Sequence, residues 1–392
     1  MPNLFDPLKI RSINFLNRIA VSPMVQTSSI DGYANNWHLV HLGSRAVGGA
    51  GLVLTEAAAI SKIGRICPND LGIWKNAHIK QLKKISSFIR DQGSVPGIQL
   101  AHAGRKASYT TPLNQNGLAP LQPLLMNNQG WQTIAPSPIS FEKNSPKPKQ
   151  MKKNDIKKII TLFAKAAERA NKANFDLIEV HAAHGYLLHQ FYSPLSNQRN
   201  DEYGGSIKNR IRLCLEVADA IRKVWPKGKV LTFRISYTDW IEGGWNLNDS
   251  ILLSKELKKR GVDIIDVSSG GTSPNAVAIA KELIEDRDKQ QTECLIPLEP
   301  GYQVEAAATI RVKAKIKTAA VGLITEPEHA QEIISGNKAD FVYLAREMLR
   351  DPYWPLRAAI KLNQTEKLSL PGQYYLAWRE KEIFTFKGQK TF

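Results

Sequence analysis

The stretch FDLIEVHAAHGY, residues 175–186, places two histidines and a tyrosine directly after an apolar run of the kind found in buried β-strands. Three explanations are open for His181 and His184. They could be a histidine pair satisfied inside the core, half of a metal site, or two hydrogen-bond donors aimed at a ligand. The choice depends on what the rest of the chain brings to the end of this strand.

Short β-rich apolar runs recur along the whole chain and alternate with segments of helical periodicity, such as residues 155–173. The runs are NRIAVS (17–22), AGLVLTEA (50–57), VPGIQLA (95–101), FDLIEVH (175–181), VLTFRIS (230–236), VDIIDVS (262–268), KTAAVG (317–322) and DFVYLA (340–345). Eight strand–helix units in one chain predict an α/β fold, a single (β/α)8 TIM barrel.

Composition is typical of a globular protein. The chain has 392 residues and is 43% hydrophobic, which is ample for a large core. It has no apolar stretch near the ~20 residues of a membrane span, and its start, MPNLFDPLKI, lacks the layout of a secretory signal. We therefore expect a cytoplasmic protein without a membrane partner. The cysteines Cys67, Cys214 and Cys294 are far apart, so we expect free thiols and no metal or cluster.

The formal net charge of +17 raises the question of a nucleic-acid partner. Much of the positive charge lies in KPKQMKKNDIKK (147–158), KELKKR (255–260) and RVKAKIK (311–317). These segments read as a loop and as helix faces, and no aromatic residues are interleaved with the charges. We therefore expect solvated basic faces, and nucleic acid is an unlikely partner.

Polar or conformationally special residues follow the predicted strands, at the edge where such barrels carry their active sites. After the last two strands come Gly322, which lets the backbone approach a ligand, and Arg346, whose forked cation suits a dianion. Barrels often bind phosphate in these two loops, so the residues suggest a phosphorylated cofactor. A Rossmann fingerprint is missing, because GGAG (48–51) precedes a strand where a dinucleotide loop would follow one.

Longer motifs carry a family resemblance. They include NRIAVSPM (17–24), IQLAHAGRKAS (98–108), IEVHAAHGYLLHQFYSPLSNQRNDEYGGS (178–206), PGYQV (300–304), AVGLIT (320–325) and LAREMLRDP (344–352). With these motifs the chain resembles the old yellow enzyme family of FMN-dependent ene-reductases, and within it the bacterial branch of xenobiotic reductases and thermophilic-like members. The resemblance covers nearly the whole chain and implies an eight-stranded barrel with non-covalently bound FMN across its C-terminal mouth.

The resemblance also implies roles for individual residues. Pro23 and Met24, flanked by Ser22 and Val25, would lie against the flavin ring, Ala57 and Gln99 would meet its polar edge, and Arg234 would sit at its N1/O2 end. Gly322, Ala345 and Arg346 would hold the phosphate. NADPH or NADH would bind transiently as reductant, and the excess of Lys and Arg slightly favours NADPH.

For the opening motif, the resemblance selects the third explanation. His181 and His184 would donate hydrogen bonds to the oxygen on which negative charge develops when an activated alkene accepts hydride. Tyr186 would then deliver the proton. The implied reaction is ping-pong reduction of activated C=C bonds in enones, enals, maleimides and nitroalkenes. No metal is expected, because nothing near the histidines supplies an obvious third ligand.

The chain departs from the family pattern in the substrate and flavin region. Val25 stands where the bacterial branch carries a cysteine, and a valine cannot hydrogen-bond flavin, so we expect a different flavin potential. Thr27 replaces a tyrosine that contacts substrate in many relatives, so the substrate pocket is expected to differ too.

The chain also departs from the family nearer its end. The loop at residues 271–303 is longer than expected and charged in its middle, as lids and binding loops often are. We expect a barrel over residues 1–365 and a C-terminal extension over 366–392. In relatives the extension carries an arginine that reaches a neighbouring subunit, and Leu376 takes its place here. A homodimer or larger homo-oligomer is still expected from the resemblance.

Two alternatives to an ene-reductase stay open. One is an FMN-barrel protein that acts on RNA, which the basic charge invites but which would need an RNA-binding stretch that does not stand out. The other is a flavin protein with little ene-reductase turnover, which the residues at positions 25 and 27 would explain.

Overall fold

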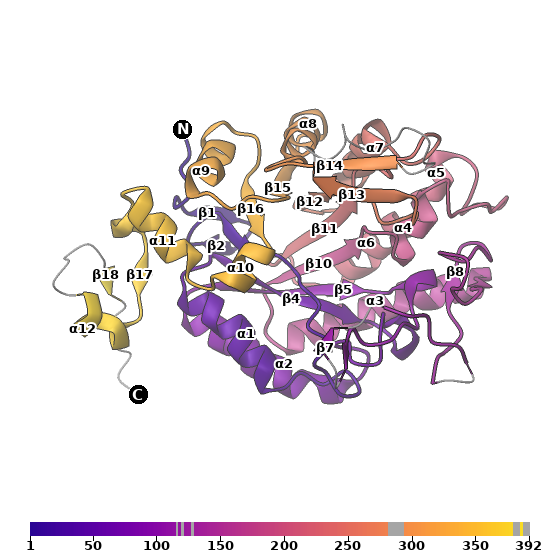
Figure 1. Ribbon diagram of the computed structural model, residues 1–392, viewed down its shortest axis with the longest axis horizontal. Helices are drawn as coiled ribbons and strands as arrows, with labels where there is room; N and C mark the ends of the chain where they lie inside the picture. The colour runs from indigo at the N-terminus through magenta and orange to yellow at the C-terminus, as the bar shows by residue number, and fades with distance from the viewer. Residues whose placement is uncertain (115–116, 119–120, 127–128, 281–293, 379–384, 387–392) are drawn as a thin grey trace.

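Eight parallel strands close into a barrel, and helices surround it (Figure 1). The computed structural model describes the chain except for residues 115–116, 119–120, 127–128, 281–293, 379–384 and 387–392. The barrel strands are β3 (Ile19–Val21), β4 (Leu52–Ala59), β5 (Val95–Ala101), β10 (Leu177–Ala182), β11 (Val230–Ser236), β12 (Ile264–Ser268), β15 (Lys317–Val321) and β16 (Phe341–Leu344). Each falls within, or within two residues of, a predicted apolar run, and the predicted (β/α)8 barrel is confirmed.

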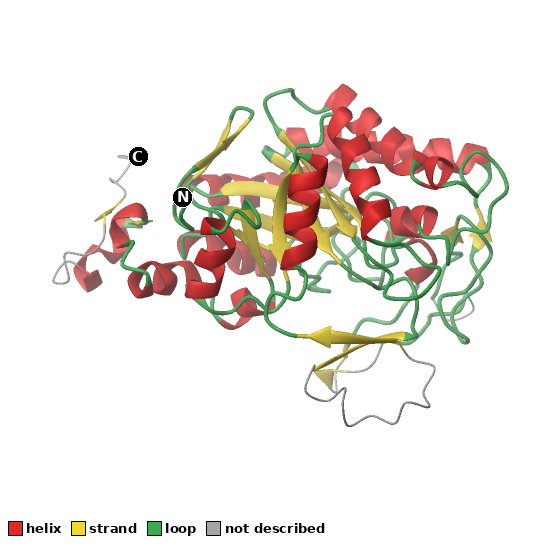
Figure 2. Ribbon diagram, turned by 90° about the horizontal axis from the view of Figure 1, so that it is seen from above, coloured by secondary structure: helices red, strands yellow, loops and turns green. Residues whose placement is uncertain are grey.

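Helices follow the strands and most of them cover the barrel from outside, whereas the last short helix stands away from it (Figures 1 and 2). They are α1 (Asn36–Val47), α2 (Ile79–Asp91), α3 (Lys153–Lys172), α4 (Leu187–Tyr192), α5 (Ile207–Arg210), α6 (Arg212–Val224), α7 (Leu247–Lys259), α8 (Val304–Ala314), α9 (Pro327–Ser335), α10 (Arg346–Arg350), α11 (Trp354–Lys361) and α12 (Tyr375–Trp378). In α3 the buried residues include Ile156, Ile159 and Phe163, which follow the helical period expected for this segment.

The interior of the barrel is closed at its N-terminal end by a hairpin. Strands β1 (Leu8–Ile10) and β2 (Ile13–Phe15) pair antiparallel, and Ile10 and Phe15 join the apolar cluster inside the barrel. Phe15 is fully buried and meets Phe341 edge to face, with ring centroids 5.0 Å apart. The hairpin therefore seals the end of the barrel opposite to the strand C-termini, where the site residues lie.

The remaining strands lie outside the barrel. They are β6 (Leu113–Asn114), β7 (Gly117–Leu118), β8 (Ile134–Ala135), β9 (Lys149–Gln150), β13 (Ala276–Ala280), β14 (Cys294–Leu298), β17 (Ser369–Leu370) and β18 (Thr385–Phe386). Strands β13 and β14 form a parallel pair within the long 271–303 loop and stand beside the ring of helices (Figure 2). The charged middle of that loop falls in 281–293, outside the described residues. Among the described helices, none combines the length and apolar character needed to cross a membrane.

The hairpin gives a direct test of the apolar seal. Replacing Phe15 by Ala removes a fully buried ring that packs on Phe341. We expect the free energy of unfolding to fall by about 3–5 kcal/mol, as for other buried aromatic truncations. Urea denaturation followed by circular dichroism measures this change. Leu16→Ala is the matched control. The Leu16 side chain is 48% exposed, so its truncation should change the free energy of unfolding little. Equal costs for the two variants would contradict the assignment of Phe15 to the seal.

Candidate active site

The two histidines and the tyrosine of the HAAHGY motif meet at the C-terminal end of β10. The rings of His181 and His184 lie with their centroids 5.2 Å apart and nearly perpendicular, and the His181 and Tyr186 centroids are 4.9 Å apart. His184 adopts a left-handed backbone conformation, with φ of +57°, and Gly185 follows with φ of +73°. A Cβ on Gly185 would stand 2.0 Å from the Gly271 carbonyl oxygen, so the turn that presents these rings needs glycine there.

Each imidazole has one ring nitrogen engaged in a hydrogen bond, and for His181 this contact fixes the tautomer. Nδ1 of His181 accepts the backbone N–H of Ala183 at 3.3 Å, so Nε2 carries the proton. Nε2 of His184 lies 2.7 Å from the Ser268 hydroxyl, which can donate to it and leave the proton on Nδ1. Burial, followed by the charge of Arg234, lowers the pKa of both histidines well below the usual value. Both imidazoles are therefore neutral N–H donors at neutral pH.

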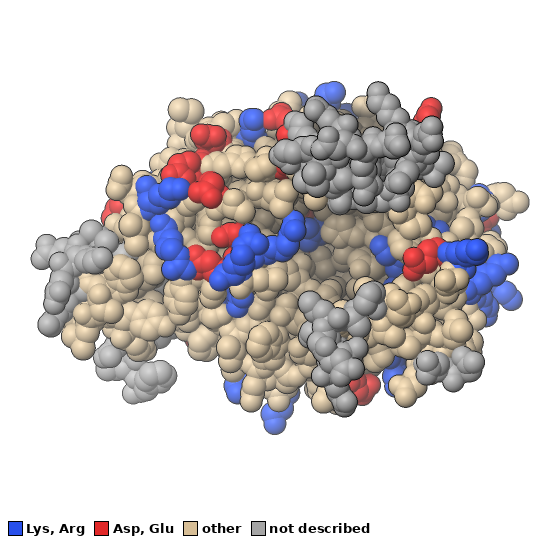
Figure 3. Space-filling view, in the orientation of Figure 1, with Lys and Arg blue, Asp and Glu red and all other residues tan. Residues whose placement is uncertain are grey.

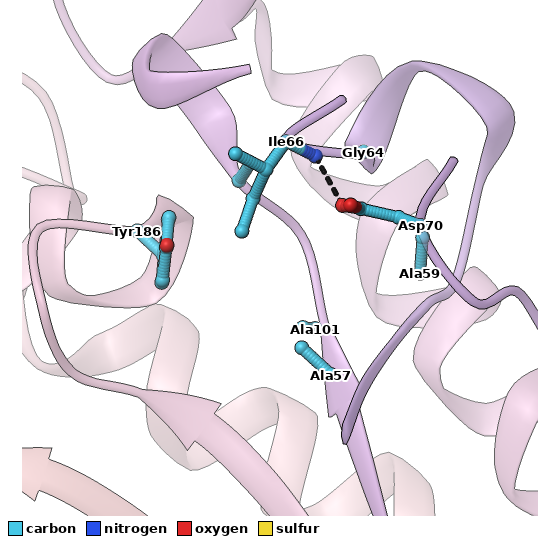
Figure 4. A pocket seen from close by; sticks show the side chains of 8 residues that line it. Ala57, Ala59, Gly64, Ile66, Asp70, Ala101 and Tyr186 are labelled. Carbon is cyan, nitrogen blue, oxygen red and sulfur yellow. Dashed lines mark hydrogen bonds between the residues drawn. The ribbon is translucent and has the colours of Figure 1, made fainter. Parts of the chain in front are cut away.

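Tyr186 faces a small pocket that Figure 4 shows from close by. The pocket is shallow and partly open to solvent, and it is lined by Ala57, Ala59, Gly64, Ile66, Asp70, Ala101, Ala103 and Tyr186. Burial raises the pKa of the Tyr186 phenol, so the hydroxyl keeps its proton at neutral pH. Across the pocket, Asp70 accepts the Ile66 backbone N–H at 2.6 Å. The predicted residues Ala57 and Tyr186 therefore line one and the same pocket.

Lys106 is a site residue that the sequence analysis missed, although it lies within the quoted motif IQLAHAGRKAS. Its ammonium donates to the carbonyl oxygens of His184 at 3.0 Å and Gly271 at 2.9 Å, which ties the loops after β10 and β12 together. It also lies 5.3 Å from the centroid of the Tyr186 ring. Burial lowers the pKa of Lys106 to about 8. Only the folded chain shows these contacts, because they join residues from three separate loops.

A second and larger cavity opens between β11, β12, β15 and β16. It encloses about 690 Å³, and it brings together Arg234, Gly322, Ala345 and Arg346, four of the residues expected to hold a phosphorylated cofactor. The sequence analysis missed its other lining residues, which are Ser268, Tyr302, Gln303, Val321, Leu323, Ile324, Thr325, Tyr343, Glu347 and Arg350. The motif PGYQV contains Tyr302 and Gln303, but the sequence alone did not indicate that their side chains line this cavity.

Arg234 is held in place at the inner end of this cavity. Its Nη1 donates to the Ser22 hydroxyl at 3.1 Å, and its Nε is 3.1 Å from an Asp266 carboxylate oxygen. On the other side of β10, Gln99 donates to the Glu179 carboxyl at 2.9 Å. The predicted residues Ser22, Gln99 and Arg234 thus have fixed side chains.

The segment after β3 carries the remaining predicted residues. Met24 packs partly against the core, whereas Val25 is 42% exposed. Thr27 has φ of +50° and donates to the Gln26 carbonyl at 2.8 Å. Glu56 holds the segment by accepting the Gln26 backbone N–H at 2.9 Å. Among the described residues, no hydrogen bond, ion pair or ring contact joins Pro23, Val25 or Thr27 to His181, His184 or Tyr186.

Charge on the face seen in Figure 1 is mixed. Lys and Arg side chains gather beside a central hollow, and acidic side chains lie among them (Figure 3). Ion pairs such as Lys361 with Glu326 and Lys338 with Glu305 bring the two signs together on the surface. Within the described part of the chain there is no group of three or more His, Cys, Asp and Glu residues that could hold a metal ion.

A barrel whose mouth combines an arginine-lined cavity with two neutral imidazoles and a protonated phenol is typical of flavin-dependent oxidoreductases. The sequence profile of the NADH:flavin oxidoreductase / NADH oxidase family matches residues 3–365. The chain belongs to this family, and the resemblance to old yellow enzyme is confirmed.

Individual relatives agree with this assignment. The NADPH dehydrogenase of Geobacillus sp. (strain WCH70) is 43% identical over 378 residues, which cover 96% of this chain and 98% of the relative. The solved structure of morphinone reductase superposes with a TM-score of 0.72 at 26% identity, covering 92% of this chain and 90% of that one. A 2-naphthoyl-CoA reductase reaches a TM-score of 0.79 at 23% identity, and the 92% of this chain that matches spans only 52% of that larger protein. The protein is an NAD(P)H-dependent FMN oxidoreductase.

Gly322 offers a test of the larger cavity. It has φ of +125°, and a Cβ there would lie 2.8 Å from the Tyr302 ring and 2.9 Å from the Gln303 amide. We expect Gly322→Ala to raise the dissociation constant of FMN about tenfold or more, because the backbone and the cavity wall must both shift. Fluorescence titration of FMN into the apoprotein measures this. Gly205→Ala is the control, since Gly205 has φ of +72° with nothing within 4 Å of a Cβ. Unchanged FMN affinity in Gly322→Ala would place the phosphate elsewhere.

Proposed function

We propose that the enzyme takes hydride from NADPH or NADH onto FMN and passes it to activated C=C bonds in enones, enals, maleimides and nitroalkenes, in a ping-pong cycle. One observation carries the proposal: two neutral imidazoles and one protonated phenol meet at the end of β10. The similarity to proteins named NADPH dehydrogenase favours NADPH as reductant.

His181 and His184 are proposed to bind the oxygen of the substrate. An alkene that accepts hydride at its β-carbon develops negative charge on its carbonyl or nitro oxygen, and donors already oriented toward that oxygen lower the barrier. Nε2–H of His181 is available because its Nδ1 is occupied by the Ala183 N–H. The Ser268 hydroxyl orients the His184 ring in the same way. Thr27 and Tyr186 complete the proposed substrate contacts.

Tyr186 is proposed to deliver the proton to the α-carbon. Its raised pKa keeps the phenol protonated until a strong carbon base appears beside it. Loss of the proton creates a phenolate, and the Lys106 ammonium lies 5.3 Å from the ring centroid, where it stabilises that negative charge. The pocket beside the phenol supports this role, because mostly apolar side chains line it and leave few groups that could compete for the proton.

The larger cavity fits FMN by its chemistry. Bound FMN supplies reversible two-electron hydride chemistry. Arg346 offers a forked cation for the phosphate at one end, and Arg234 offers one for the N1/O2 edge of the ring at the other. Gly322 leaves room that a Cβ would fill. The residues proposed to hold the cofactor are Ser22, Pro23, Met24, Val25, Ala57, Gln99, Arg234, Gly322, Ala345 and Arg346.

The two half-reactions separate the proposed roles. In anaerobic stopped-flow absorbance, NADPH should bleach the bound flavin, and 2-cyclohexenone should restore its colour. Tyr186→Phe should bleach at the normal rate and recover about 10²–10⁴-fold more slowly, because only the second half needs the proton. Tyr192→Phe is the control, since the Tyr192 hydroxyl donates to the Ala182 carbonyl and lines neither cavity. Recovery at the normal rate in Tyr186→Phe would show that the phenol is not the proton donor. Failure of 2-cyclohexenone to restore the colour of the unmodified enzyme would contradict the alkene proposal.

We also propose that the chain assembles as a homodimer through its C-terminal extension, 366–392. Leu376 is 72% exposed and Tyr375 is 50% exposed on the short helix α12, which stands away from the barrel (Figure 1). Light scattering on the eluted protein should give about twice the 43.7 kDa chain mass. Leu376→Asp should shift the protein toward monomer, whereas Leu252→Asp, at a 37% exposed position on α7, should not. A monomeric unmodified protein would contradict the proposal.

A further inference from the structure

A layer of polar side chains lies inside the barrel, directly beneath the mouth. Glu179, Arg234 and Asp266 stand on three consecutive strands, β10, β11 and β12, and the side chains of Glu179 and Asp266 are fully buried. Gln99 on β5 and Tyr343 on β16 complete the layer. The next layer toward the hairpin is apolar and contains Leu54, Leu177, Val230, Ile264 and Phe341. Two acids and one cation are therefore enclosed together, cut off from water on the lower side.

The charges in this layer do not balance if both acids ionise. Arg234 pairs with Asp266 at 3.1 Å. Among the described residues no Lys, Arg or His nitrogen comes within ion-pair distance of Glu179, whose Oε1 accepts only the neutral Gln99 amide. A buried carboxylate without a cation is costly, so Glu179 carries a proton while Asp266 is ionised. The two acids together hold one proton and one negative charge.

The other groups that face the pair support this distribution. Burial raises the pKa of Glu179, and repulsion from Asp266 raises it further, while Arg234 opposes the rise. Burial also raises the pKa of Asp266, again opposed by Arg234. The Tyr343 hydroxyl lies beside Glu179 and can donate to its carboxyl, which opposes the rise in the pKa of Glu179 and raises the pKa of the phenol. The remaining barrel strands β3, β4 and β15 contribute Ala20, Leu54 and Ala319 to the interior, none of which titrates.

Several polar atoms of the layer have unused hydrogen-bonding capacity. Asp266 Oδ1 and the Thr232 hydroxyl are buried without a hydrogen-bond partner in the described part of the chain, and Glu179 Oε2 has only the Tyr343 hydroxyl beside it. Native barrels satisfy nearly all such atoms. A layer with an unsatisfied carboxylate oxygen is suited to accept a further proton, because protonation removes a buried charge and turns an acceptor oxygen into a donor.

The layer is connected to the cofactor cavity through two of its members. Arg234 and Tyr343 both line that cavity, and each is also next to one of the acids. A reduced flavin would carry negative charge at its N1/O2 end. That charge would attract the Arg234 guanidinium, which would then stabilise ionised Asp266 less. Negative charge arriving at Arg234 therefore raises the proton affinity of the acids behind it.

We propose that Glu179 and Asp266 form a proton-exchange pair beneath the cofactor, which takes up one proton from solvent when FMN is reduced and releases it when FMN is reoxidised. This inference rests on the FMN site proposed above. In the first half-reaction the hydride and its two electrons pass from the nicotinamide to the cofactor, and one carboxylate, with a solvent proton, becomes a carboxyl. In the second half-reaction the hydride leaves to the alkene, and the carboxyl returns its proton to solvent. Tyr186 supplies the separate proton that enters the product.

The pH dependence of the midpoint potential tests the pair. Spectroelectrochemistry of the holoenzyme from about pH 5 to 9 gives the number of protons bound per two electrons. Over the pH range in which the pair titrates, we expect the unmodified enzyme to bind two protons per two electrons. One proton is part of the hydride, and the other binds to the acids. The double variant Glu179→Gln/Asp266→Asn should bind one proton per two electrons. Thr232→Val is the matched control, because it alters the same buried layer without removing a titratable group, and it should bind two.

The named outcomes separate this proposal from the proposed function. A double variant that still binds two protons places the second proton on the cofactor and overturns the pair, even if the enzyme reduces alkenes normally. An unmodified enzyme that binds one proton throughout overturns it as well. If the double variant does not fold, the reduced-minus-oxidised infrared spectrum of the unmodified holoenzyme decides. It should show a new carboxyl C=O band on reduction, and a spectrum without that band counts against the proposal.

Discussion

Everything at the mouth of the barrel depends on closure of the strand ring between β16 and β3. These strands pair in parallel from Val342 with Ile19 to Leu344 with Val21, and the Ser22 backbone N–H donates to the Leu344 carbonyl at 3.0 Å. The closure joins segments that are more than three hundred residues apart in the chain. It places Ser22 where it can accept a hydrogen bond from Arg234 on the far side of the ring. Without it, Arg234 and Arg346 at the two ends of the larger cavity would have no fixed separation.

The fold could be read from the sequence because each strand and each helix has its own local period. The eight apolar runs are buried on both faces, as parallel strands covered by helices must be, and α3 repeats its buried residues every three or four positions. Residues at the ends of strands could be predicted for the same reason, since the barrel rule assigns them to one rim. Arg234, Gly322 and Arg346 do meet in one cavity.

What the sequence could not supply are contacts that depend on how loops fold over the rim. Lys106 looks like any lysine in a loop until the carbonyls of His184 and Gly271 come together around its ammonium. Tyr302 and Gln303 reach the cavity only because the chain returns from β14 across the mouth. The hairpin that seals the barrel was missed because its two strands have three residues each, too few for a periodic pattern to stand out.

The sealed end determines how reactants reach the mouth of the barrel. With Ile10 and Phe15 filling the bottom of the barrel, compounds can reach the mouth from one side only. Under the proposed cycle, oxidised nicotinamide must therefore leave through the same opening by which the alkene arrives. The two reactants then share a single entrance, and an excess of either one inhibits binding of the other. Competition between donor and acceptor is in this sense a property of the architecture, because side chains fill the barrel from the polar layer down to Ile10 and Phe15.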